Sequence, residues 1–326
     1  MPNQNRILTV VSVLIMISTL ARAQERPGQG GFGQLDRDLS ALNSTAPLNP
    51  SKAAGAPAPT FTFEIVAFPG VDARQLASGI NDHGRIVGTY TTVSPDRNGY
   101  LLQGTNFKKI VYPGSGTNIT RAIGINRSGV VVGLYSSDQG ATEHGFVMKG
   151  NNFTSLDYPG ASMTTANAIN AKGVIVGASS TGQNIFHGFM LSGGTYTQLD
   201  YPSSLSTLAY GINASGEIVG LYQQADGTYH GFTLQNGVYA NVDYPGATET
   251  DLLGINDSGQ MVGYYSDDGG TTYHAFLLDA GVFTPFDVPF GGATRTFAHG
   301  INNHNQIVGG YVDSAGYLLG FVASFQ

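Results

Sequence analysis

The sequence predicts an all-β fold, a six-bladed β-propeller with four strands per blade. Three observations predict it: a unit of about 44 residues recurs six times, each unit holds four short apolar stretches, and charge is scarce. The 326 residues include 46 Gly, and Asp, Glu, Lys and Arg together make up 11%. Average globular domains have about 25% charged residues and about 7% Gly. The composition therefore favours short strands joined by tight turns over helical bundles.

The repeat is marked by a Gly-Ile-Asn triplet, with Ala-Ile-Asn as one of its six copies. Successive Asn residues lie 45, 44, 43, 43 and 46 positions apart. An apolar run ending in Gly follows each triplet, then His-Gly-Phe or a related triplet, then in four copies a segment such as Leu-Asp-Tyr-Pro. Four strands in a unit of this length are typical of a propeller blade. The copies of the first triplet occupy residues 79–81, 124–126, 168–170, 211–213, 254–256 and 300–302.

Two recurring turns separate these strands. Asn-x-x-Gly between apolar runs predicts a type I turn with positive φ at its fourth residue, where Asn305 replaces Gly in the last copy. Asn is the best non-Gly residue for that conformation. Tyr-Pro-Gly-Ala at 158–161 and 244–247 predicts a type II turn that ends a strand.

The order of the strands follows from crowding near the axis. The strand ending in Gly-Ile-Asn carries Ala and Gly, so we place it innermost, followed by the Ile-Val-Gly, His-Gly-Phe and Asp-Tyr-Pro strands. The chain then begins with an outermost strand (Phe61 to Phe68) and ends with a third strand (Leu318 to Phe325). We expect the N-terminal strand to complete the last blade and close the ring, which hides sheet edges. A β-solenoid is the main alternative, although its coils are usually shorter.

The N-terminal segment predicts export. Arg6, the apolar run from Ile7 to Leu20, and Ala21-Arg22-Ala23 form a signal peptide over residues 1–23. Residues 24–59 read as a flexible Gly/Pro/Ala-rich linker, and residues 60–326 as the six-repeat propeller domain. The chain has no Cys, so we expect neither disulfides nor a lipid anchor at the cleavage point. The expected location is secreted, periplasmic or at the cell surface.

The charge balance narrows the class of partner. The formal net charge of −7 disfavours nucleic acid and, after signal cleavage, a membrane surface. We expect an extracellular glycan or protein as partner, and a monomeric propeller.

At the triplets themselves the chain resembles a known family. The His-Gly-Phe copies, His274-Ala275-Phe276 and the recurring G-I-N-x-x-G-x-I-V-G are similar to the HAF family of bacterial extracellular repeat proteins. The resemblance covers about residues 61–326 and departs at Asn98-Gly99-Tyr100 and Leu319-Gly320-Phe321. It implies secretion and a repeat architecture, and it supplies no reaction or catalytic residues. The blade layout is also similar to a kelch blade, by strand order alone.

Residues that recur at the same place in several blades are interpreted as framework, because a site is normally needed once. We expect the repeated His to form structural hydrogen bonds, the repeated Asp to satisfy turn amides, and the repeated Tyr to pack between blades. Metal binding by the His set is not expected, since equivalent positions lie far apart around a ring. The sets are His144, His187, His230 and His274; Asp157, Asp200, Asp243 and Asp287; and Tyr90, Tyr135, Tyr222, Tyr265 and Tyr311.

A ligand site is expected where equivalent positions diverge. The connections before the innermost strands vary, and so does the residue just before each triplet: Ser78, Ile123, Asn167, Tyr210, Leu253 and His299. These connections open on one end of the ring, although ordinary loop drift is the plainer explanation. The candidate ligand-binding residues are Arg74, Arg121, Tyr210, Glu249, Asp251, Arg295 and His299.

Enzyme and metal motifs are weak. The sequence lacks a G-x-S-x-G elbow, H-E-x-x-H, a phosphate loop and a dinucleotide fingerprint. Asp267-Asp268-Gly269-Gly270 lacks the remaining acidic positions of a calcium loop and is interpreted as a turn tip. No cofactor or metal centre is predicted. A weak Ca²⁺ site at Glu249 and Asp251 stays possible, against the alternative of a solubilising acidic surface.

Two functions remain open. The first is a secreted binding or scaffold module for a glycan or protein. The alternative is an extracellular hydrolase or lyase with its active site on the inter-blade loop face. A cluster of acid, base and His on one face favours the enzyme, and scattered polar and Tyr residues favour binding.

Overall fold

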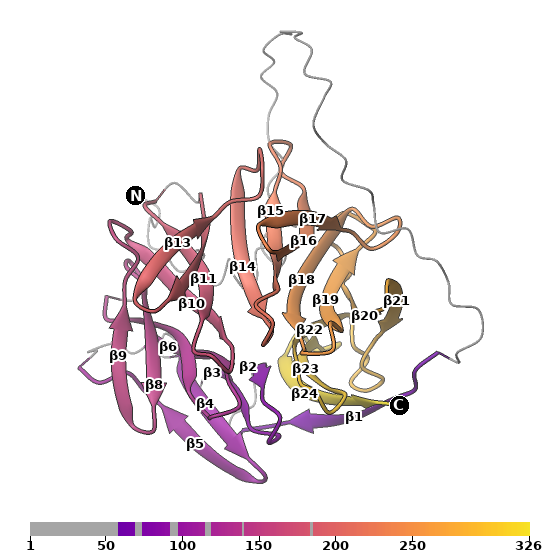
Figure 1. The fold of residues 1–326 in the computed structure, drawn as a ribbon. Helices are drawn as coiled ribbons and strands as arrows, with labels where there is room; N and C mark the ends of the chain where they lie inside the picture. The colour runs from indigo at the N-terminus through magenta and orange to yellow at the C-terminus, as the bar shows by residue number, and fades with distance from the viewer. Residues whose placement is uncertain (1–57, 69–73, 92–96, 115–118, 139, 183–184) are drawn as a thin grey trace, which may run out of the picture.

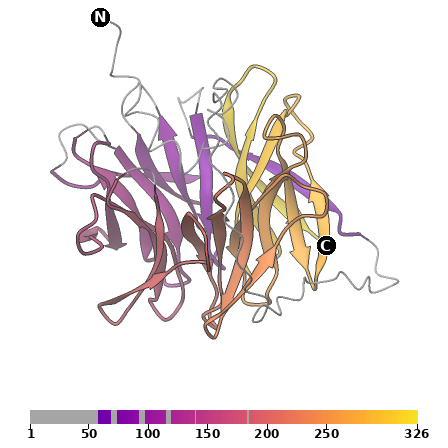
Figure 2. The ribbon, with the colours of Figure 1, turned by 90° about the horizontal axis from the view of Figure 1, so that it is seen from above.

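The computed structural model describes residues 58–68, 74–91, 97–114, 119–138, 140–182 and 185–326. The predicted signal peptide and nearly all of the predicted linker lie outside these residues. The described chain is all-β, with twenty-four strands and no helix that could cross a membrane. The fold is a β-propeller: the sheets are arranged around a central axis (Figure 1), and Figure 2 shows the same ring from a second direction.

Each sheet is built from antiparallel strands that follow one another in the chain. The order in each four-stranded sheet is the predicted one, from the innermost strand outwards. These sheets are β6 (Ile119–Ile125), β7 (Val131–Ser136), β8 (His144–Lys149) and β9 (Asn152–Leu156); β10 (Met163–Ile169), β11 (Ile175–Ser180), β12 (His187–Ser192) and β13 (Thr195–Leu199); β14 (Ser206–Ile212), β15 (Ile218–Gln223), β16 (Tyr229–Gln235) and β17 (Val238–Val242); and β18 (Glu249–Ile255), β19 (Met261–Ser266), β20 (His274–Asp279) and β21 (Val282–Phe286).

The remaining eight strands form one sheet that contains both ends of the described chain. Its order is β22-β23-β24-β2-β3-β4-β5, and β1 pairs with the other side of β24. The strands are β1 (Phe61–Val66), β2 (Arg74–Ile80), β3 (Ile86–Thr91), β4 (Asn98–Gln103), β5 (Asn106–Ile110), β22 (Arg295–Ile301), β23 (Gln306–Val312) and β24 (Leu318–Phe325).

The N-terminal strand pairs with the C-terminal strand, as predicted. Antiparallel pairing of β1 with β24 runs from Phe61 opposite Phe325 to Val66 opposite Gly320. The Phe61 ring also stacks on Phe286 of β21, with centroids 4.5 Å apart. Strand β1 therefore covers an edge of β24 that would otherwise be free to pair with another chain.

The predicted turns are present. The amide of Gly84 donates to the oxygen of Asn81 at 3.0 Å, and Gly84 has φ of 68°. Asn305 takes the same conformation, with φ of 58°. The amide of Ala161 donates to the oxygen of Tyr158 at 3.0 Å across the Pro-Gly turn, where Gly160 has φ of 80°.

Asn side chains join the innermost strands into a closed ring of hydrogen bonds. The Nδ2 atom of each triplet Asn donates to the backbone oxygen of the next one, from Asn81 round to Asn302, and the last bond returns to Asn81. The Oδ1 atom of the same residue accepts from amides of its own turn, for example His83 and Arg85 on Asn81. Each buried Asn side chain thus stabilises its own turn and also links two neighbouring innermost strands, because an amide carries both a donor and an acceptor.

The Gly of each Ile-Val-Gly strand is required by close packing. A Cβ atom on Gly220 would lie 2.1 Å from the backbone oxygen of Leu208, and one on Gly133 would lie 1.9 Å from that of Arg121. Further out, the third residue of the His-Gly-Phe triplet is fully buried: Phe146, Phe189, Phe232 and Phe276 are all 0% exposed. These rings form part of the hydrophobic core.

Candidate functional site

A β-bulge interrupts every innermost strand at the residue before the triplet. In β14, Ala209 pairs with Gly220 and Gly211 pairs with Val219, so the strand register skips Tyr210. A bulge re-aims the side chain that it leaves unpaired. The six bulged residues are Ser78, Ile123, Asn167, Tyr210, Leu253 and His299.

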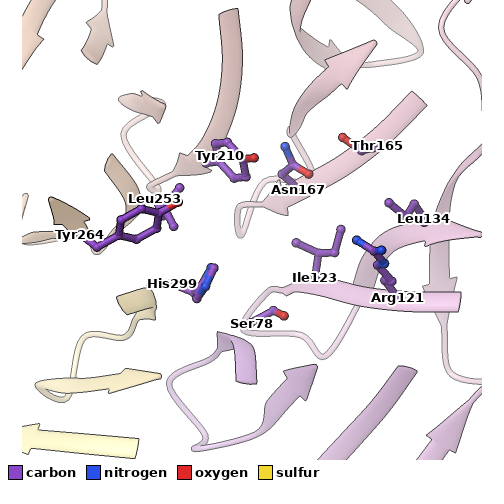
Figure 3. Close-up of a pocket in the computed structure, with 10 residues that line it drawn as sticks. All are labelled: Ser78, Arg121, Ile123, Leu134, Thr165, Asn167, Tyr210, Leu253, Tyr264 and His299. Atoms are coloured by element: carbon purple, nitrogen blue, oxygen red, sulfur yellow. The ribbon is translucent and has the colours of Figure 1, made fainter. Parts of the chain in front are cut away.

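These six side chains meet at the axis, where they line a cavity of about 40 Å³ (Figure 3). Arg121, Leu134, Thr165 and Tyr264 complete its wall. The cavity adjoins a second one of about 100 Å³, lined by the same bulged residues and by the Gly-Ile backbone below them. A third cavity of about 240 Å³ lies around the Asn ring at the other end of the axis. We call the first the upper axial cavity and the third the lower mouth.

Three of the predicted site residues line the upper axial cavity. Arg121 is the third residue of β6 and is 3% exposed, and Tyr210 and His299 are the bulged residues of β14 and β22. Burial lowers the pKa of His299 to about 4, so its imidazole is neutral at pH 7. Burial also raises the pKa of Tyr210, to which the nearby Asp251 carboxylate adds.

The other four predicted residues lie beside or outside that cavity. Asp251 is buried behind Tyr264, whose pKa is raised first by burial and then by Asp251. Glu249 accepts a hydrogen bond from the Tyr273 hydroxyl at 3.4 Å, and the Arg295 guanidinium lies 6.0 Å from the centre of the same ring. Arg74 begins β2 and is exposed. Three of the seven candidates therefore line the upper axial cavity, and Asp251 lies just behind its wall. The other three lie outside the cavity.

Glu249 and Asp251 occupy alternate positions of β18, as expected for residues facing one side. Both carboxylates lie against tyrosines, Tyr273 and Tyr264 respectively. No group of three or more His, Asp or Glu able to hold a metal ion is found in the described part of the chain.

A partly buried charged cluster beside the cavity was missed from the sequence. Arg97 and Glu143 stand just before β4 and β8, where the other blades carry Phe186, Tyr229, Tyr273 and Leu318. Glu143 is 1% exposed, and neither of its oxygens accepts a hydrogen bond from a described residue. Burial and then the Arg121 charge lower the pKa of Arg97 to about 9. A charge at a position that is aromatic or Leu in the other four blades was the available signal.

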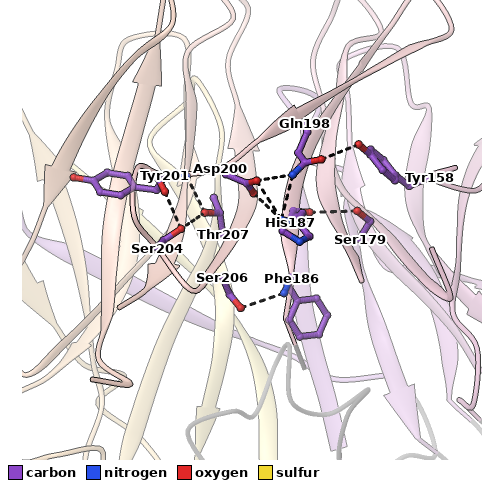
Figure 4. Close-up of polar contacts among 10 residues, drawn as sticks. All are labelled: Tyr158, Ser179, Phe186, His187, Gln198, Asp200, Tyr201, Ser204, Ser206 and Thr207. Atoms are coloured by element: carbon purple, nitrogen blue, oxygen red, sulfur yellow. Dashed lines mark hydrogen bonds and ion pairs between the residues drawn. The ribbon is translucent and has the colours of Figure 1, made fainter. Parts of the chain in front are cut away.

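The repeated His and Asp belong to the outer part of the blades, away from the axis. His187 Nδ1 lies 3.0 Å from an Asp200 oxygen (Figure 4), and the same pair recurs as His144–Asp157, His230–Asp243 and His274–Asp287. The expected hydrogen bonds of the repeated His are present, with Asp as the partner. The expectation that these Asp satisfy turn amides is wrong, because pairing of the third and fourth strands sets each carboxylate beside the imidazole.

The repeated Tyr pack between blades, as predicted. Tyr222 of β15 stacks on Tyr201 of the preceding repeat, with centroids 3.7 Å apart and planes 3° from parallel. Tyr135 with Tyr112 and Tyr265 with Tyr244 do the same, at 3.5 and 3.6 Å. The third repeat departs from this, because Ser179 takes the Tyr position and donates to the oxygen of His187 (Figure 4).

Comparisons with known proteins bear on the fold alone. A triple arginine-to-alanine mutant of AofleA from Arthrobotrys oligospora is similar at a TM-score of 0.54 and 13% identity, over 86% of this chain and 91% of that one. Aleuria aurantia lectin, as a point mutant with Fucα1-6GlcNAc, gives 0.50 and 12%, over 77% and 94%. TolB from Acinetobacter baumannii gives 0.51 and 10%, over 74% and 66%. No protein-family model and no curated protein matches the chain.

Proposed function

We propose that this protein is an exported, monomeric six-bladed β-propeller that binds a glycan at the upper axial cavity. The observation that carries the proposal is the set of six bulges, each of which turns a different side chain into one shared cavity. Repeated residues build the frame, and the residues that vary between repeats converge on the space a ligand could enter. This arrangement is typical of a binding site on a rigid scaffold.

Six blades follow if the eight-stranded sheet is counted as two. Strands β2 and β24 share a single parallel bridge, Arg74 to Leu318. Equivalent parallel bridges, Arg97 to Ile119 and Tyr273 to Arg295, join separate sheets elsewhere in the ring. The bridge at Arg74 is therefore counted as a contact between two blades. On that count β22, β23, β24 and β1 make the sixth blade.

A glycan is the preferred ligand class because of the cavity wall. Hydroxyl, amide, imidazole and guanidinium groups from Ser78, Asn167, His299 and Arg121 stand beside the apolar Ile123 and Leu253. Sugars need this mixture of hydrogen-bonding groups and apolar contact. The Aleuria aurantia lectin complex, which shares the fold, holds Fucα1-6GlcNAc, so fucosylated glycans belong in the first screen.

The test is a glycan array with matched tryptophan insertions at the two ends of the axis. Leu253→Trp fills the upper axial cavity, and Ala171→Trp adds the same ring at the lower mouth. We expect binding by the wild type and by Ala171→Trp, and loss in Leu253→Trp at an unchanged melting profile. Binding that survives Leu253→Trp but not Ala171→Trp would assign the ligand to the lower mouth. Sequencing of the exported N-terminus tests cleavage after Ala23.

A hydrolase or lyase is the second candidate. Its support is the neutral His299, a base, on the same cavity wall as the Tyr210 hydroxyl, with the Asp251 carboxylate near that hydroxyl. A cavity of about 40 Å³ can receive the end of a sugar residue but not its whole reacting ring, which favours recognition of a terminal group over cleavage. Cleavage of any polysaccharide by the wild type, with loss of that activity in His299→Asn, would favour the enzyme.

A further inference from the structure

The Asn167 side chain presents one unused acceptor to the upper axial cavity. Its Nδ2 atom donates to the backbone oxygen of Ala209 at 2.9 Å, which fixes the orientation of the amide. Its Oδ1 atom is buried and has no hydrogen-bond partner among the described residues. A buried acceptor left without a donor costs free energy. The occupant of the cavity must therefore carry a hydrogen-bond donor at Asn167.

On the Arg121 side of the same cavity the wall is cationic. Arg121 is 3% exposed, and the Arg97 guanidinium is close enough for the two charges to repel. Glu143 is the acid that acts on both of them. Of the two guanidinium groups, Arg121 is the buried one, and the Glu143 oxygens accept no hydrogen bond from it or from any other described residue. A buried charge without a hydrogen-bonded counter-charge is unfavourable. The occupant must also carry an anionic acceptor towards Arg121.

The size of the cavity limits the group that can enter. A water molecule needs roughly 10–15 Å³ of such volume, so the space of about 40 Å³ holds about three water-sized polar positions. Two carboxylate oxygens and one neighbouring hydroxyl would occupy three such positions.

We infer that the upper axial cavity recognises a hydroxycarboxylate, the acidic end of a uronic acid residue. The carboxylate pairs with Arg121, and the adjacent hydroxyl donates to Asn167 Oδ1 and contacts Ser78 Oγ. This rests on the proposed glycan-binding function and narrows it to acidic glycans. The same chemistry occurs in small hydroxy acids, so the probes must separate the two sources.

The experiment is calorimetric titration of the exported chain with glucuronic acid, glucose and glycolate. We expect glucuronic acid to bind at least about tenfold more tightly than glucose, the loss that follows when one charge-assisted contact is missing. Arg121→Gln should abolish that preference. Asn167→Asp keeps the acceptor for the hydroxyl but adds a negative charge that repels the ligand carboxylate and competes for Arg121, so it should weaken glucuronic acid at least about tenfold. The matched control is Arg127→Gln, an arginine of the lower mouth, which should change nothing.

The outcomes separate this inference from the proposed function. Equal binding of glucose and glucuronic acid, both lost in Leu253→Trp, would overturn the acidic specificity and leave the glycan site standing. Binding of glycolate without either sugar would support the hydroxycarboxylate chemistry and overturn the glycan. No heat with any probe would overturn the inference and leave the cavity as a water site. If Arg121→Gln does not fold, Ser78→Ala provides the second variant, with an expected severalfold loss for glucuronic acid.

Discussion

Asn302 donates a hydrogen bond from Nδ2 to the backbone oxygen of Asn81, which lies 3.1 Å away and 221 residues earlier in the chain. This bond joins the last innermost strand to the first. Its Oδ1 atom also accepts from the amides of His304 and Gln306 at 2.9 and 3.1 Å. One side chain therefore satisfies three buried or partly buried backbone groups.

Replacement of this residue should destabilise the ring strongly. Asn302→Ala leaves those backbone groups unpaired, and we expect a loss of about 3 kcal/mol in the free energy of unfolding. Urea denaturation measures it. Asn305→Gly, in the same turn, is the control, because Gly tolerates the positive φ of 58° at that position. A loss for Asn302→Ala no larger than for the control would contradict the role of the ring.

Removal of strand β1 should open the propeller. Deletion of residues 24–70 takes away the whole pairing with β24 and the Phe61 ring that stacks on Phe286. We expect a large fall in melting temperature or aggregation through the freed edge. Deletion of residues 24–58 keeps β1 and should have little effect. Equal melting temperatures for the two truncations would rule out closure by β1.

A methyl group at Gly220 should not fit. The added Cβ of Gly220→Ala meets the Leu208 oxygen at 2.1 Å and the Phe232 ring at 2.7 Å. The strands must move apart, and overpacking of this kind costs about 3 kcal/mol. The matched variant is Gly84→Ala, where no atom lies within 4 Å and only the positive φ is unfavourable. Chemical denaturation should show a clearly smaller loss for Gly84→Ala, and similar losses would contradict the packing argument.

Acid should weaken the fold through His299. Its pKa falls from the usual 6.5 of an exposed histidine to about 4 in the folded state, so the unfolded chain binds the proton more tightly. The contribution of His299 is complete above pH 6.5 and is lost as the pH falls towards 4, by up to about 3 kcal/mol. Melting temperatures between pH 7 and pH 4 measure this, and His299→Gln should have a flatter profile. A profile as steep in His299→Gln as in the wild type would place the titration elsewhere.

The local signals in the sequence were sufficient for the turns and for the order of strands. Asn81 and Gly84 stand three residues apart, and their turn depends on their own backbone preferences. The triplet Asn was expected to start a turn, but its bond to the next repeat was not foreseen. That bond depends on how neighbouring repeats face each other, which no single repeat encodes.

The candidate site was predicted only in part, because it too depends on how neighbouring strands pair. Arg121, Tyr210 and His299 could be chosen because their positions vary between repeats. Arg74 and Arg295 vary as well, but each is the first residue of its strand and stays at the rim. The bulge decides which side chains reach the axis. It becomes visible only when the partners of Ala209 and Gly211 in the neighbouring strand are known.

The bulges also separate the side chains that line the upper axial cavity from the strand pairs that hold the propeller together. The strand register skips Tyr210, while Ala209 and Gly211 on either side of it stay paired with the next strand. A new side chain at such a position changes the wall of the upper axial cavity without breaking a strand pair. The same fold could therefore carry many different cavity walls.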